Sequence, residues 1–153
     1  MRLITFGGLQ LEDFKTRGKM PLLLLSYLLV EGPQARRYVA ELFWPTASDS
    51  LNSLSASLSR LRRIDPQLIG ADGERIWAHE AESDVQDFLL AMQSGRLEQV
   101  QALYQGPFLH GVKNRGWSTE LEEWVYSQRE LLAANARYAL LKLAETEAAQ
   151  GHF

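Results

Sequence analysis

The chain of 153 residues contains no cysteine, so it forms no disulfide and offers no thiolate for metal or redox chemistry. This absence fits a reducing compartment, and we expect a cytoplasmic protein. The longest apolar run, Met20 to Val30, is interrupted by Pro21, Ser26 and Tyr27 and is too short to span a bilayer. The N-terminus lacks the charged-then-apolar order of a signal peptide. We therefore expect no membrane partner.

An excess of positive charge is also missing. The net charge is −3, which argues against non-specific binding of polyanions by the whole surface. Residues 1–83 hold ten Lys or Arg against ten Asp or Glu, whereas residues 84–153 hold six against nine. A surface that binds nucleic acid must therefore be local and lie in the first half of the chain.

Motifs for catalysis and cofactor binding are absent as well. The sequence has no GxxxxGK[ST] nucleotide loop and no GxSxG nucleophile motif. Gly7 and Gly8 predict a tight turn, because no Lys-Ser/Thr pair follows them. His79, His110 and His152 are scattered over three segments, which disfavours a metal site. We expect a protein that is not an enzyme and has no cofactor and no metal.

The most informative stretch is SLNSLSASLSRLRR, from Ser50 to Arg63, which predicts an amphipathic helix. Its inward stripe is expected to be Leu51, Leu54, Leu58 and Leu61. Its opposite face carries Asn52, Ala56, Ser59, Arg60 and Arg63. A helix with small polar groups followed by arginines can enter the major groove of DNA. An ordinary surface helix is the alternative, since Arg near a C-terminus also suits the helix dipole.

The elements around this helix predict a winged helix-turn-helix. Their expected order is two strands within Met1–Glu12, a buried helix from Pro21 to about Glu31, a helix from Arg37 to Phe43, the Ser50–Arg63 helix, and a hairpin of Gln67–Ile69 with Arg75–His79. Ser48 or Asp49 is expected to cap the third helix. Two helices joined by a short turn and followed by a hairpin are typical of a winged DNA-binding domain with N-terminal strands, here residues 1–83.

Residues 84–153 predict a separate helical domain. Two helices are expected over Val85–Met92 and Arg96–Tyr104, and a long helix is expected to follow Trp117 and run to Gly151. Ser118-Thr119 with Glu122 suggests a capping box at its start. Alanine-rich helices separated by glycine are typical of helical-repeat proteins. The fold class predicted for the whole chain is mainly α, within α+β.

Three stretches resemble one family of bacterial regulators. VAELFWPTASDSLNSLSASLSRLRR (Val39 to Arg63) resembles a stretch of activators of the Streptomyces antibiotic regulatory protein type. YQGPFLHG (Tyr104 to Gly111) and LEEWVYSQRELL (Leu121 to Leu132) resemble the bacterial transcriptional activator domain that follows it. The resemblance implies a response-regulator-type winged helix and a tetratricopeptide-like helical domain. It also implies an activator that binds promoter repeats and helps to recruit RNA polymerase.

The chain departs from the family where the recognition helix begins. The family usually has more basic residues there, whereas positions 51, 55 and 56 are Leu, Ser and Ala. Fewer phosphate contacts imply weaker and less salt-dependent binding.

Eight residues are the candidate contacts to double-stranded DNA. They are Asn52, Ser55, Ser59, Arg60 and Arg63 on the third helix, Arg36 and Arg37 at the start of the second helix, and Arg75 in the wing. Arg62 is a weaker candidate, because it lies nearer the core flank.

Two further expectations concern proteins as partners. The final helix carries Leu140, Leu141, Leu143 and Ala144 on several sides, which predicts either a truncated helical domain from a longer array or self-association. We favour self-association, with a homodimer as the default. The alternative function is a protein-interaction module, in which a degenerate winged helix no longer binds DNA and the helical domain binds a partner protein.

Overall fold

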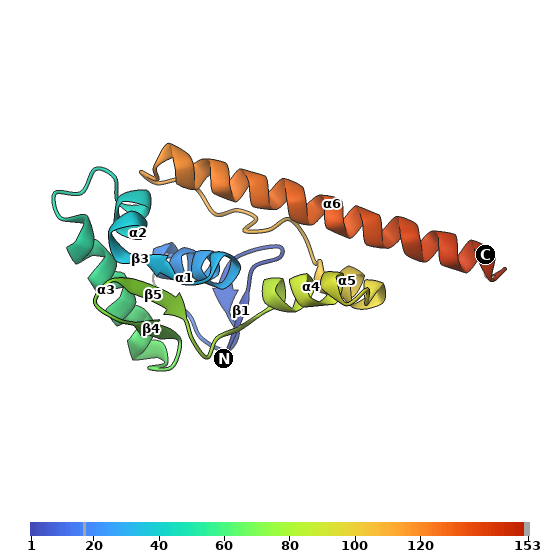
Figure 1. The fold of residues 1–153 in the computed structure, drawn as a ribbon, viewed down its shortest axis with the longest axis horizontal. Coiled ribbons are helices and arrows are strands. Elements are labelled where there is room, and N and C mark those ends of the chain that lie inside the picture. Colours follow the sequence, from blue (N-terminus) through green and yellow to red (C-terminus); the bar gives the residue numbers. More distant parts are fainter. Residues whose placement is uncertain (17, 152–153) are drawn as a thin grey trace.

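The computed structural model describes residues 1–16 and 18–151. Within them it has six helices and two three-stranded sheets (Figure 1). In chain order the elements are β1 (Arg2–Ile4), β2 (Gln10–Leu11), α1 (Met20–Glu31), β3 (Gln34–Ala35), α2 (Arg36–Phe43), α3 (Ser50–Ile64), β4 (Ile69–Ala71), β5 (Arg75–Ala78), β6 (Glu82–Ser83), α4 (Asp84–Gln93), α5 (Leu97–Leu103) and α6 (Thr119–Ala149). The fold is mixed α/β and mainly helical.

Helix α1 lies at the centre of the first half of the chain. Nine consecutive residues, 21–29, are buried, as expected for a helix that is apolar on all sides. It contacts α3, α4 and β5. Gly32 ends the helix with a φ of 79°, and its N–H donates to the carbonyl of Leu28 over 2.9 Å.

Helices α2 and α3 pack against each other. The side chain of Asp49 caps α3 by accepting the N–H of Asn52 over 3.0 Å. Leu54, Leu58 and Leu61 are buried, as predicted. The prediction that Leu51 faces inward is wrong, because its side chain is 37% exposed. Leu51 lies in the first turn at the edge of the buried face, and Ser57 occupies a place in the core instead.

The two sheets are small and join distant parts of the chain. β1 pairs with β2 antiparallel and with β6 parallel. β5 pairs antiparallel with both β3 and β4. β4 and β5 form a hairpin as predicted, but its first strand is Ile69–Ala71 and lies two residues later than the predicted Gln67–Ile69. Gly70 lies opposite Trp77 in this hairpin, and a Cβ atom at position 70 would collide with the indole. The strands β3 and β6 were not predicted.

The two halves of the chain share one continuous core. The ring of Phe6 lies 5.0 Å from that of Phe88 and 5.2 Å from that of Tyr104, measured between centroids. The buried carboxylate of Asp84 accepts the backbone N–H groups of Thr5 and Phe6 and the hydroxyl of Thr5. The N-terminal strand is therefore held by α4 as well as by its own sheet. The division into domains at residue 83 stays a prediction.

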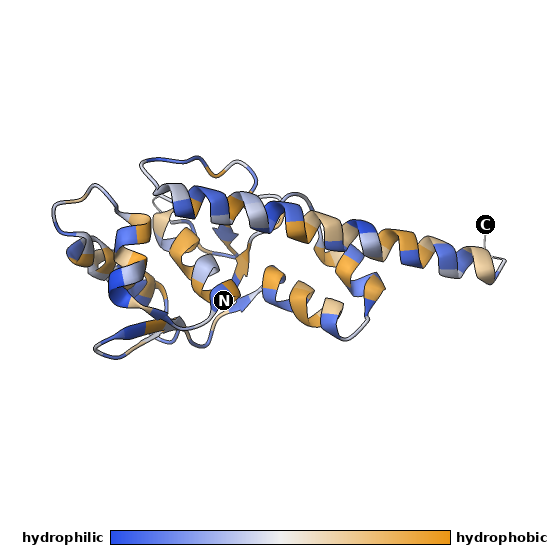
Figure 2. Ribbon diagram, turned by 45° about the horizontal axis from the view of Figure 1, so that its top comes forward, coloured by the Kyte–Doolittle hydropathy of each residue, from blue (hydrophilic) through white to orange (hydrophobic). Residues whose placement is uncertain are grey.

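Helix α6 runs along one side of the molecule and extends beyond the other elements at its C-terminal end (Figure 1). Ser118 caps it by accepting the N–H of Leu121 over 3.0 Å. Glu122 is therefore one residue too late for a capping box, and it accepts the side-chain amide of Asn114 instead. Figure 2 shows hydrophobic residues recurring along the extended part of this helix. In the part of the chain that the structure describes, no helix has the length and apolar character needed to cross a membrane.

Candidate nucleic-acid interface

The outer face of α3 carries five of the predicted DNA-binding residues. All five are exposed to solvent: Asn52, Ser55, Ser59, Arg60 and Arg63. Ala56 lies on the same face and is also exposed, whereas Arg62 is half-buried. Because the opposite side of α3 is packed in the core, this face is presented on a rigid element.

The arginines of this face are not neutralised by neighbouring acids. Across residues 1–16 and 18–151, neither Arg60 nor Arg63 has a carboxylate oxygen within 4.0 Å. Both guanidinium groups are therefore available to an external anion such as a DNA phosphate.

The structure brings Arg36 and Arg75 together at the turn of the β4–β5 hairpin. Arg36 donates from Nε to the carbonyl of Asp72 over 3.1 Å and from its backbone N–H to the carbonyl of Glu74 over 2.8 Å. The N–H groups of Arg75 and Glu74 donate to the carboxylate of Asp72 and hold the pKa of that group below its usual value. An ionised acid therefore lies beside the two arginines and weakens their positive potential.

Arg37 is the second residue of α2, and its side chain is exposed. It makes no ion pair with any of the described residues. The candidate contacts thus form two groups, one on α3 and one around the start of α2 and the hairpin turn.

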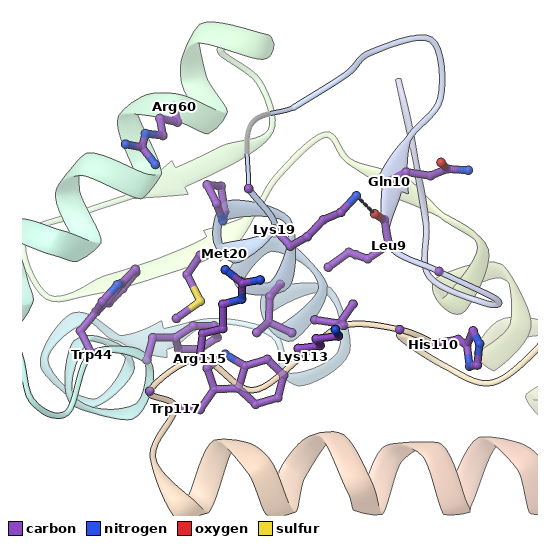
Figure 3. A pocket seen from close by; sticks show the side chains of 18 of the residues that line it. Leu9, Gln10, Lys19, Met20, Trp44, Arg60, His110, Lys113, Arg115 and Trp117 are labelled. Atoms are coloured by element: carbon purple, nitrogen blue, oxygen red, sulfur yellow. Dashed lines mark hydrogen bonds between the residues drawn. The ribbon is translucent and has the colours of Figure 1, made fainter.

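Arg60 also borders a hollow that the sequence did not predict (Figure 3). Three other cations line the same hollow: Lys19, Lys113 and Arg115. The segment KNRGW shows two of these cations in the sequence, but nothing local indicates that it borders the same hollow as Arg60. This proximity depends on contacts between segments that are far apart along the chain.

Two of the motifs that resemble the activator family meet in space. Arg129 of α6 donates from Nε to the carbonyl of Phe108 over 2.7 Å and from Nη2 to the carbonyl of Leu109 over 2.6 Å. Trp124 packs edge-on against Phe108 and against Tyr27 of α1. These residues fix the loop before α6 and join it to the core, which is a structural role.

Among the described residues, no group of three or more His, Asp or Glu side chains is placed to hold a metal ion. His152 lies outside the described residues. No family model matches the chain, and no curated protein matches it.

Proposed function

We propose that this protein is a sequence-specific DNA-binding transcriptional regulator that reads the major groove with the outer face of α3. The observation that carries the proposal is the exposed, acid-free surface of that helix, where Asn52, Ser59, Arg60 and Arg63 all reach solvent. Short polar side chains can hydrogen-bond to base edges and phosphates, and arginine suits guanine and phosphate.

The elements next to α3 support a winged helix-turn-helix within residues 1–83. α2 and α3 are joined by a turn, and the β4–β5 hairpin follows α3 directly. The helix pairs α4–α5 and α5–α6 are in contact, which supports the proposal of a tetratricopeptide-like domain over residues 84–153. By its resemblance to the activator family, we propose an activator that works in the cytoplasm and contacts RNA polymerase.

We further propose that the protein acts as a homodimer through α6. Three large apolar side chains on one side of this helix are exposed: Leu131, Tyr138 and Leu141. Family members bind repeated promoter sequences, and a two-fold dimer would match paired half-sites.

A protein-interaction module is the second candidate. The ionised carboxylate of Asp72 beside Arg36 and Arg75, and the exposed Leu51 at the start of α3, favour it. In that case the face of α3 would bind a protein in place of DNA.

The test is selection of bound duplexes from a random library with the full chain, followed by fluorescence anisotropy at several salt concentrations. We expect one sequence to be enriched. The double variant Arg60→Ala/Arg63→Ala should bind it more weakly and reduce the salt slope by about one for each arginine that contacts a phosphate, because a phosphate contact releases a counterion.

The control removes two exposed arginines elsewhere, in Arg96→Ala/Arg137→Ala, and should leave affinity and slope unchanged. No enriched sequence, or equal affinity of the folded Arg60/Arg63 variant and the parent protein, would reject α3 as a DNA-reading helix and favour the interaction module.

A further inference from the structure

A hollow of about 920 Å³ lies between segments that are distant in the sequence. Its walls come from the Gly8–Gln10 turn, the start of α1, the end of α2, Arg60 of α3 and the segment 110–117 (Figure 3). This volume is within the range typical of sites for small ligands.

The charged side chains of this hollow are all cationic. Lys19, Arg60, Lys113 and Arg115 line it together with His110, and no Asp or Glu is among its described lining residues. Lys19 already donates to the carbonyl of Leu9 over 2.7 Å. Arg60, Lys113 and Arg115 have no carboxylate oxygen within 4.0 Å in the described part of the chain. Such a gathering is unusual in a protein whose net charge is −3, and it favours an anion.

The rest of the lining is apolar and aromatic. Trp44 and Trp117 are partly buried, and Met20 lies near them (Figure 3). Leu23 and Phe43 are almost fully buried and form part of the same wall. Indole rings bind flat apolar groups well, and their faces also attract the guanidinium groups that hold an anion.

We propose that this hollow binds a small organic anion with a flat apolar body, in which a carboxylate, sulfonate or phosphate group contacts Lys113 and Arg115, while Arg60 adds positive charge from the opposite side of the hollow (Figure 3). This site goes beyond the proposed DNA-binding function, because Lys113 and Arg115 lie outside α2, α3 and the hairpin. It shares only Arg60 with the proposed interface.

A DNA backbone is a less suitable occupant of this hollow. Phosphates on a duplex are met by cations and hydrogen-bond donors on an accessible surface. A recess with two tryptophans and buried Leu23 and Phe43 in its wall instead fits a ligand small enough to enter it.

The experiment uses the full chain and the fluorescent probe 8-anilinonaphthalene-1-sulfonate, with affinity measured by fluorescence and calorimetry. N-phenyl-1-naphthylamine, which has the same aromatic body without the sulfonate, is the neutral comparison. We expect the sulfonate to bind at least about tenfold more tightly than the neutral amine, because the charge-assisted contacts are lost with the anion.

The variant Lys113→Met/Arg115→Met should bind the sulfonate about tenfold more weakly while keeping its circular dichroism spectrum and melting temperature. The matched control Arg137→Met/Lys142→Met removes two exposed cations of α6. This control variant should bind the probe with the same affinity as the parent protein. A changed affinity would indicate that the probe binds to the apolar surface of α6.

Three results would overturn the site. The first is equal affinity for the sulfonate and the neutral amine. The second is an unchanged affinity of the Lys113/Arg115 variant for the sulfonate probe. The third is a Lys113/Arg115 variant that no longer binds DNA but still binds the probe. The third result would indicate that the segment 110–117 contacts the DNA backbone. Because the probe is measured without DNA, its failure leaves the proposed function of α3 standing.

Discussion

At the scale of single residues, α3 contains two leucines of opposite environment. Leu58 is 1% exposed and lies in the core, whereas Leu51 is 37% exposed in the first turn. Leu58→Ala should lower the free energy of unfolding by about 2–5 kcal/mol, because it leaves a cavity in a packed interior. Leu51→Ala should change it by about 0.5 kcal/mol or less. Urea denaturation measures both, and similar losses for the two variants would contradict the orientation of α3.

The residues of α3 also show what the sequence could and could not predict. Helical periodicity placed Asn52, Ser59, Arg60 and Arg63 on the outer face, because positions three and four apart share a side. It misplaced Leu51, because periodicity defines a direction around the helix and does not reveal where the neighbouring elements end.

At the scale of elements, the junction of β1 with α4 depends on one carboxylate. Asp84 is buried, and its oxygens accept bonds of 2.7–3.0 Å from Thr5, Phe6 and Val85. All of these partner groups are hydrogen-bond donors, so both carboxylate oxygens of Asp84 must accept hydrogen bonds. Asp84→Asn turns one oxygen into an amide donor that faces other donors. We expect it to lower the free energy of unfolding by about 1–3 kcal/mol.

Asp87→Asn is the matched control, on the same helix and with the same change. The carboxylate of Asp87 is partly exposed and pairs with Arg2 over 2.7 Å, so its loss should cost about 1 kcal/mol or less. Thermal or urea denaturation measures both variants. If Asp84→Asn were as mild as Asp87→Asn, the carboxylate would not be what joins β1 to α4.

The helices could be predicted from the sequence, but the shortest strands could not. α1, α2 and α3 begin and end within one or two residues of the expected positions, because caps, prolines and apolar spacing are local signals. β3 and β6 have two residues each and pair with β5 and β1, which are far along the chain. Such pairing depends on tertiary contacts and leaves no periodic pattern to detect.

At the scale of the whole molecule, the dependence on tertiary contacts also explains why the cationic hollow could not be predicted from the sequence. The sequence shows Lys113 and Arg115 as ordinary loop residues. They come near the start of α1 and the end of α2 because Arg129 holds the carbonyls of Phe108 and Leu109 and because the N–H of Ser118 donates to the carbonyl of Leu42. Sites assembled from several distant segments can be recognised only once the fold is known.

The exposed surface of α6 indicates which side of the helix would form the contact in the proposed dimer, which the sequence alone did not indicate. Leu131, Ala134, Tyr138 and Leu141 are all exposed and are spaced alternately three and four residues apart. This spacing places them on one stripe and matches the seam of a coiled coil. Leu140 is exposed on a different side, and Leu143 is half-buried.

Leu141→Glu should therefore convert a dimer into a monomer, because it places a charge within the apolar seam. Leu140→Glu introduces the same charge one residue away on another side of the helix and should remain dimeric. Sedimentation velocity over a wide range of protein concentrations measures both. A parent protein that stays monomeric throughout, or equal dissociation of the two variants, would reject a two-fold contact along this stripe. Under the proposed function, paired promoter half-sites would then be bound by independent copies of the chain.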